Sequence, residues 1–331
     1  MSSVLAPPPR NPVEPLSAPP TFSIVIPAYQ AAETIGDSVR SALEQVHPAH
    51  EIIVVDDGST DDLESALRPF DHQITVIRQK NGGSAAARNT GANAATGDFM
   101  AILDADDAYH PRRIEALARL ACARPDLDLV TTDARFVANG EAVGTFLAHN
   151  PFAVENQRAA ILESCFVGGW PAVRLSRLRA VGGFDESLRI GHDWDCWLRL
   201  ILDGSAAGLV DEPYYDYGLH QGSLTASRVS SLWDRARMLE KAQNNPNLLP
   251  EERPALSRSL RRHRTRAVLA ETRAALFDSG TRSHLLGFAL SSGVEARARL
   301  RAAVAFAAPP LARRLFGEDE PGEHGLVPGH P

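Results

Sequence analysis

The sequence predicts an α/β fold with a mostly parallel central sheet and a helical C-terminal extension. Between residues 21 and 133, short apolar runs rich in β-branched residues alternate with segments of helical spacing. From Ser231 to about Phe316, the pattern is helical and rich in Ala, Leu and Arg. Strands that alternate with helices at this spacing indicate right-handed βαβ units, whose strands lie parallel in one sheet.

The elements of the α/β part follow in a regular order. Ile35, Val39 and Leu43 recur at i, i+4 and i+8, the spacing of a helix that covers one sheet face. Small residues fill the third helical segment, which predicts close packing against a sheet or a ligand. The expected strands are FSIVIP, EIIVVD, ITVI and DFMAILD, and the expected helices are ETIGDSVRSALEQV, TDDLESALRPF, GGSAAARNTGANAATG and PRRIEALARLACA, whose Pro falls in the first turn.

The remaining chain is less regular. LDLVTTDARFV reads as a strand that leads into a hairpin, and a later helix carries Trp194 and Trp197. We therefore expect four regions: a disordered Pro-rich leader over 1–20, an α/β domain over 21–230, a helical region over 231–316, and a disordered tail over 317–331.

Composition narrows the function classes. The net charge of −7 over 331 residues argues against a general nucleic-acid binder. Three scattered cysteines without a C-x-x-C pair favour a reduced chain with neither a disulfide framework nor a zinc site. The N-terminus lacks the pattern of a signal peptide, and no stretch reaches the roughly 18 apolar residues of a membrane span. We expect a cytoplasmic protein.

Acidic residues follow two of the expected strands. Asp56 and Asp57 end the second, and Asp104, Asp106 and Asp107 end the fourth. Ligands of open parallel sheets bind outside the carboxyl ends of the strands. Asp104 and Asp106 point the same way in extended backbone and can approach one hard cation, Mg²⁺ or Mn²⁺. The alternative, strongest for DDGSTDD, is that these residues only form turns and helix caps.

No standard phosphate-binding motif identifies the anion that such a metal would bind. Neither G-x-x-x-x-G-K-[ST] nor a G-x-G-x-x-G after the first strand is present. The segment NGGSAAARN offers a flexible glycine pair, a helix start and Arg88 as a neighbour for a pyrophosphate.

Six motifs in order resemble family 2 glycosyltransferases of the GT-A fold, a Rossmann-like arrangement of a mostly parallel sheet with flanking helices. They are SIVIPAYQ, VVDDGSTDD, GGSAAARNTGANAATGDFMAILDADD, VGGFDESL, HDWDCWLRL and YYDYGLHQGSLT, and they cover about residues 21–226. The resemblance implies an inverting transferase that uses a nucleotide-diphosphate sugar, with a UDP-sugar favoured over GDP or dTDP donors, and Mg²⁺ or Mn²⁺.

The resemblance also implies roles for single residues. Asp193 would be the general base, and Asp106 with His220 would hold the metal. Asp57 would accept a base N–H, Arg88 would lie near the ribose or diphosphate, and Asp104 would face the ribose. The implied nucleotide-sugar-binding residues are Pro27, Ala28, Tyr29, Asp57, Gly83, Arg88, Asp104 and Ala105.

Several of these residues have a second interpretation. Asp193 is also suited to cap the helix that follows it, and Asp195 competes with it as the base. Trp170 suits an acceptor platform, although aromatic residues are more often core. His192 stands where the family has Glu before the base, which changes the surroundings of Asp193 and its acceptor contacts. Gly218 stands where Arg is common, which removes a cation near the diphosphate and weakens the case for His220.

Outside the motifs, the C-terminal helices are strongly basic. Eleven arginines and no lysine lie between Arg253 and Arg301. One interpretation is peripheral contact with an anionic inner membrane surface, and the other is a solvated lid or a homodimer face.

Two rival functions stay open at this stage. One is a catalytically silent nucleotide-sugar-binding protein, and the other is a nucleotidyltransferase or a phosphatase, which also places acids at strand ends.

Overall fold

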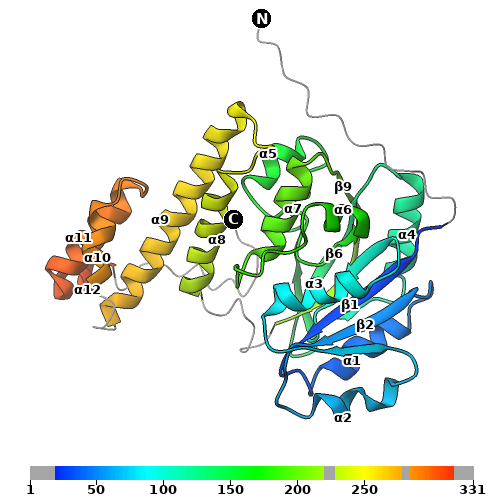
Figure 1. Ribbon diagram of the computed structural model, residues 1–331. Helices are drawn as coiled ribbons and strands as arrows, with labels where there is room; N and C mark the ends of the chain where they lie inside the picture. The colour runs from blue at the N-terminus through cyan, green and yellow to red at the C-terminus, as the bar shows by residue number, and fades with distance from the viewer. Residues whose placement is uncertain (1–18, 220–227, 278–282, 317–331) are drawn as a thin grey trace, which may run out of the picture. The chain divides into compact units, whose positions relative to one another are not determined.

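The computed structural model describes residues 19–219, 228–277 and 283–316, and these form two compact units (Figure 1). The N-terminal unit comprises the described residues up to 219, and the C-terminal unit comprises the rest. Each unit has its own packing and is described by itself.

The N-terminal unit is a mixed sheet with helices around it. Its strands run in the spatial order β3-β2-β1-β4-β8-β6-β9-β5, and β7 pairs with β6. The strands are β1 Phe22–Ala28, β2 Glu51–Asp56, β3 Thr75–Arg78, β4 Phe99–Ile102, β5 Ala108–Tyr109, β6 Leu129–Ala138, β7 Glu141–Thr145, β8 Ala172–Arg174 and β9 Ala207–Gly218. The helices are α1 Ile35–Leu43, α2 Leu63–Leu67, α3 Ser84–Ala94, α4 Arg113–Ala123, α5 Gln157–Ile161, α6 Leu175–Ala180 and α7 His192–Leu202.

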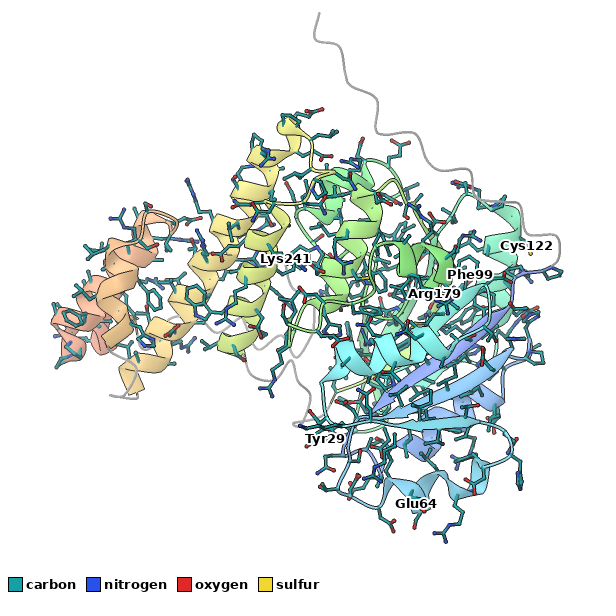
Figure 2. All side chains as sticks on the ribbon, viewed as in Figure 1. Tyr29, Glu64, Phe99, Cys122, Arg179 and Lys241 are labelled. Carbon is teal, nitrogen blue, oxygen red and sulfur yellow. The ribbon has the colours of Figure 1, made fainter. Side chains whose placement is uncertain are left out.

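In the parallel half of the sheet, the chain adds strands first on one side of β1 and then on the other. β1 pairs in parallel with β2 on one side and with β4 on the other. The chain moves outward from β1 to β3 and then crosses back to β4, so right-handed connections place α3 on the face opposite α1 and α2. Ligands of such sheets bind at the carboxyl ends of the strands where the winding reverses, here β1 and β4. Figure 2 shows Tyr29, just after β1, and Phe99, at the start of β4, toward opposite ends of the sheet.

Helix α3 packs unusually close to the sheet, as its small residues predict. A Cβ added at Gly91 would lie 2.3 Å from a methyl of Val25 on β1, so only glycine permits this approach. Ile24, Val25 and Ile26 are fully buried beneath the helices. This close packing brings the rest of α3, including Arg88, directly over the sheet.

The second half of the sheet differs from a purely parallel arrangement. β8 lies between β4 and β6 and runs antiparallel to both. The predicted hairpin is present as β6 and β7. The sequence interpretation missed β5, β8 and the long strand β9, which runs parallel to β6 and antiparallel to β5. Pro111 precedes α4 rather than lying in its first turn, because the helix begins at Arg113.

The C-terminal unit consists of helices. Within it, α9 packs against α8, α11 and α12, and α10 packs against α11. No helix within the described segments has the length and hydropathy of a membrane-spanning helix. The helices are α8 Arg228–Ala242, α9 Arg253–Phe277, α10 Ser283–Leu290, α11 Ala296–Ala307 and α12 Pro309–Phe316.

Candidate active site

The acidic loop after β4 carries three carboxylates with different environments. Asp104 and Asp106 are partly exposed, whereas Asp107 is buried. Ala105, between the first two, is buried as well. The loop therefore offers two carboxylates to a ligand and keeps the third inside the protein.

Asp107 ties this loop to strand β9. It accepts a hydrogen bond from the Tyr215 hydroxyl at 2.5 Å and another from the Gly218 N–H at 2.8 Å. The same hydroxyl lies 3.3 Å from the backbone N–H of Asp104, which donates to it. Burial raises the pKa of Asp107 well above its usual value, and the neighbouring charges of Asp106 and Asp104 add to that rise. Tyr215 thus contacts both ends of the acidic loop.

Arg88 connects the acidic loop with the start of helix α7. One of its terminal nitrogens lies 2.8 Å from Asp104, and the other lies 3.3 Å from Nε2 of His192. The guanidinium is 4% exposed. Burial lowers the pKa of Arg88, but the negative charges of Asp104 and Asp193 outweigh it and the pKa is raised overall. Arg88 is therefore a permanent cation held between two acidic segments.

His192 is a buried, neutral imidazole. Burial and the nearby charge of Arg88 lower the pKa of His192 to about 4. Because Arg88 is a donor only, Nε2 must accept its hydrogen bond and Nδ1 must carry the proton. That Nδ1 is buried and has no hydrogen-bond partner among the residues that the structure describes.

Asp193 lies in the first turn of α7 and is partly exposed. The residue before the helix is Gly191, with a left-handed φ of 81°. The interpretation of Asp193 as the helix cap is therefore wrong, since the cap position falls two residues earlier. One carboxylate oxygen accepts from the N–H of Trp194 at 2.7 Å.

The other acceptor candidates lie inside the protein. Asp195 is 2% exposed and pairs with Arg199 at 2.8 Å, one helical turn away. Trp170 is 5% exposed, stacks on Tyr215 and donates its indole N–H to the carbonyl of Thr132. Both side chains are therefore buried and bonded within the protein, where they support the site.

Asp57 forms hydrogen bonds with the segment that leads into helix α3. Its carboxylate accepts hydrogen bonds from the side chain of Gln79 and from the N–H groups of Gly82 and Gly83, all between 2.7 and 2.8 Å. Asp57 is 3% exposed. Its carboxylate therefore already accepts three hydrogen bonds from the protein. A nucleobase N–H that bonded to Asp57 would have to use an oxygen that already accepts one of them.

The end of β1 and the residue after it differ in exposure. Ala28 is buried, Pro27 is partly exposed and Tyr29 is 53% exposed. The side chain of Gln30 accepts the N–H groups of Thr60 and Asp61, and so joins this segment to the loop after β2. Tyr29 consequently presents a ring to solvent from a segment that is held in place.

The candidate metal ligands are only partly within the described structure. His220 lies outside the described residues. Among the residues that are described, no group of three His, Cys, Asp or Glu side chains is arranged to hold an ion. The donors present fit Mg²⁺ or Mn²⁺ nevertheless, because Mg²⁺ is usually bound by one or two carboxylates, several waters and the phosphates of a substrate.

Sequence reasoning missed two residues beneath the acidic loop. Tyr215 holds the loop, and Arg113 is fully buried with its guanidinium 4.7 Å from the ring of Tyr109 and 5.0 Å from that of Tyr215. Arg113 donates to the hydroxyl of Thr132 and to the carbonyl of Trp170. A tyrosine cluster in YYDYG was the one signal in the sequence for this layer.

Comparison with known proteins agrees with this geometry. Residues 23–181 match the model described as "Glycosyl transferase family 2". This region, slightly under half of the chain, is similar to glycosyltransferase family 2. An uncharacterized glycosyltransferase of Rickettsia prowazekii is 29% identical over 191 residues, which is 54% of this chain and 58% of that protein. The chain thus spans little more than half the length of this relative.

Two other similar proteins are matched over most of their own length. The putative teichuronic acid biosynthesis glycosyltransferase TuaG of Bacillus subtilis is 29% identical over 229 residues, covering 67% of this chain and 89% of TuaG. The crystal structure of S. aureus TarS 1–349 in complex with UDP superposes with a TM-score of 0.62 at 17% identity, covering 89% of this chain and 87% of that one. The structural likeness confirms the predicted GT-A fold.

Proposed function

We propose that this family 2 glycosyltransferase transfers a sugar from a nucleotide-diphosphate donor to an acceptor hydroxyl with inversion, and that it depends on Mg²⁺ or Mn²⁺. The observation that carries the proposal is the position of Arg88. Its guanidinium contacts Asp104 of the acidic loop and His192, the residue before Asp193. A donor-binding carboxylate and a candidate base therefore lie around one buried cation.

Donor binding is assigned to the carboxyl ends of β1, β2 and β4. Tyr29, with Pro27 and Ala28, borders the nucleobase, and Asp57 with Gly83 forms the adjoining wall. Asp104 faces the ribose and Arg88 the diphosphate. A UDP-sugar is the favoured donor, and the UDP complex of TarS supports this choice, with GDP and dTDP as the alternatives.

The metal is assigned to Asp106, with His220 as a second candidate ligand. When bound, it would neutralise charge on the departing diphosphate without a proton donor. Asp107 is unsuited to this role because Tyr215 and Gly218 already occupy its carboxylate. Asp106 is taken as the principal carboxylate because it is the second acid of the D-x-D pair, while Asp104 pairs with Arg88.

Asp193 is assigned as the general base. A single displacement requires a base on the face opposite the leaving group, and a carboxylate there accepts the proton of the acceptor hydroxyl. His192 is neutral beside it, and the negative charge of Asp193 helps to raise the pKa of the buried cation Arg88, so this carboxylate and Arg88 interact directly. Asp195 is excluded from the role by its burial and its pairing with Arg199.

The acceptor is assigned only by class, as a hydroxyl of a polysaccharide, a lipid-linked glycan or a natural product. The name of TuaG, a putative teichuronic acid biosynthesis enzyme, supports a polysaccharide.

Calorimetric titration of UDP into the protein, with Mn²⁺ and then with EDTA, tests the donor site. We expect binding with Mn²⁺, loss of most of it with EDTA, and the same loss in Asp106→Ala. Asp211→Ala, which removes an exposed carboxylate of β9, is the matched control and should bind like the parent. If UDP, GDP and dTDP all fail to bind, the donor assignment is wrong.

A catalytically silent nucleotide-sugar-binding protein is the second candidate, and His192 and Gly218 are the observations that favour it. Incubation with UDP-sugars and Mn²⁺ separates the two. A silent protein binds UDP and releases no sugar, whereas a transferase shows slow hydrolysis of the correct donor.

A further inference from the structure

Large exposed apolar side chains are concentrated in the last three helices. In the described part of the N-terminal unit, the exposed large apolar residues are one tyrosine and four valines: Tyr29, Val46, Val76, Val143 and Val154. The 34 residues of 283–316 expose five leucines and a phenylalanine instead. They are Leu286 at 47%, Leu290 at 73%, Leu300 at 64%, Phe306 at 43%, Leu311 at 49% and Leu315 at 50%.

These side chains are arranged on helix faces. Leu286 and Leu290 of α10 are four residues apart and so share one face, and the same holds for Leu311 and Leu315 of α12. In α11 an outward stripe of apolar residues follows the helical repeat at i, i+4, i+7 and i+11. Its members are Ala296, Leu300, Ala303 and Ala307, of which all but the partly exposed Ala303 are exposed.

The same helices already have a buried face. Leu285 of α10, Ala305 of α11 and Ala312 of α12 pack in one cluster with Ala275 and Leu276 of α9. The other alanines of the inner face of α11, Ala298 and Ala302, pack in a second cluster with Val268 and Val294. The outward leucines are therefore not the core of this unit. A helix that is apolar on both sides lacks the polar outer face of an ordinary surface helix.

The charge of this segment is positive. Residues 283–316 contain five arginines against one acid, Glu295, whereas the whole chain has a net charge of −7. The side chain of Arg297, which pairs with Glu295 at 3.1 Å, is 73% exposed, and Arg314 is exposed as well. The stem of an arginine can lie along an apolar surface while its charge stays in water.

We propose that helices α10, α11 and α12 bind the surface of an anionic lipid bilayer. The leucines and Phe306 would enter the boundary between headgroups and acyl chains, and the arginines would contact lipid phosphates. Helices of 8, 12 and 8 residues are far shorter than the roughly 20 residues needed to span a bilayer, so they lie in its surface.

Charge favours a membrane over a second copy of this chain. Residues 221–316 carry 17 Arg and Lys against 7 Asp and Glu, so two such regions that meet face to face would repel each other. An anionic bilayer complements both the arginines and the aliphatic side chains. This inference does not depend on the transferase proposal, since it concerns only the C-terminal unit.

Co-sedimentation of the full chain with vesicles tests the inference. The probes are vesicles of phosphatidylcholine alone and vesicles with one part phosphatidylglycerol to three parts phosphatidylcholine. We expect binding to the mixed vesicles at low salt, little binding to the neutral ones, and weakening as salt rises.

Two double variants separate the apolar from the electrostatic contribution. Leu290→Gln with Leu300→Gln should lower the partition coefficient at least tenfold, because two exposed leucines no longer enter the bilayer. Arg297→Gln with Arg314→Gln should lower it roughly tenfold on mixed vesicles only. Val143→Gln with Val154→Gln is the matched control in the N-terminal unit and should bind like the parent, and circular dichroism should show that all variants keep their helices.

Three results would overturn the inference. The first is failure of the parent chain to bind the mixed vesicles. The second is equal binding by the Leu290→Gln, Leu300→Gln variant. The third is a concentration-dependent dimer, seen by sedimentation velocity and lost in that variant, without vesicle binding. This third result would assign the face to a second copy. None of them changes the expected titration of UDP, so failure here is distinguishable from failure of the proposed function.

Discussion

The two units of this chain carry opposite net charges. Residues 1–220 contain 30 acidic and 17 basic side chains, whereas residues 221–316 contain 7 acidic and 17 basic ones. In the N-terminal unit, Arg174 and Asp128 form a buried ion pair, and the buried Arg88 pairs with the partly exposed Asp104. In the described part of the C-terminal unit the ion pairs lie mostly at the surface, and large apolar side chains are exposed as well.

We infer from this difference that the two units have different functions. A buried ionic group keeps a fixed position and is strongly affected by its neighbours, which suits binding and proton transfer. Exposed charges are screened by salt and contribute little to stability, but they attract distant partners. Substitutions in each unit can test this division.

Asp193→Asn should give the largest effect. An amide of the same shape cannot accept the acceptor proton, so kcat should fall by roughly 10²–10⁴-fold, the usual contribution of a single positioned base. Steady-state transfer measures this, and UDP affinity by calorimetry should stay within about twofold. Asp211→Asn is the control, and equal losses in both variants would contradict the assignment.

Arg174→Gln and Arg237→Gln compare an ion pair from each unit. Arg174 and Asp128 are 5% and 2% exposed, so the variant leaves a buried carboxylate with only the longer contact to Arg177 at 3.5 Å and should destabilise by about 3 kcal/mol. The side chain of Arg237 is 69% exposed beside Asp234, and its loss should be about 1 kcal/mol or less. Urea unfolding followed by tryptophan fluorescence measures both, and similar losses would remove the distinction between the units.

Tyr215→Phe tests the support of the acidic loop. Without the hydroxyl, Asp107 keeps one donor and Asp104 loses the acceptor of its N–H, which should destabilise by about 1–3 kcal/mol. The Mn²⁺ concentration for half-maximal transfer should rise several-fold because the loop is less well positioned. Tyr109→Phe removes a hydroxyl that donates to the carbonyl of Ile102, and serves as the control. It should lose stability without the change in Mn²⁺ dependence.

One buried histidine in each unit predicts acid sensitivity. Burial is the main cause that lowers the pKa of His192 and of His263 to about 4. In the unfolded chain these groups protonate near pH 6.5, so stability is present above that pH and is lost as the pH falls toward 4. Each should contribute about 1–2 kcal/mol of the stability lost between pH 7 and pH 5.

Urea unfolding at the two pH values tests this expectation. His192→Gln should reduce the pH dependence of the N-terminal unit, and His263→Gln that of the C-terminal unit. His72→Gln, at an exposed position, is the control and should leave the dependence as it is. An unchanged pH dependence in both buried variants would show that these histidines are not the cause.

The βαβ units were predictable because each strand is a continuous apolar run and each helix has a one-sided spacing. Strand β9 was not, because Asp211, Glu212 and Pro213 interrupt its apolar residues and its pairing with β6 shifts in register. The acids at the strand ends were predictable from the topology of parallel sheets. The contacts of Tyr215 with Asp104 and Asp107 were not, since more than 100 residues separate the partners.

The surroundings of Gly218 explain why this chain lacks an arginine at the position where Arg is common in the family. Its N–H donates to Asp107, and a Cβ added there would lie 2.6 Å from the backbone oxygen of Asp106. Any side chain at this position would displace the backbone of the acidic loop. Gly218→Arg alone should therefore disturb the acidic loop instead of adding a usable cation, so this position accepts a larger residue only together with a change in the loop.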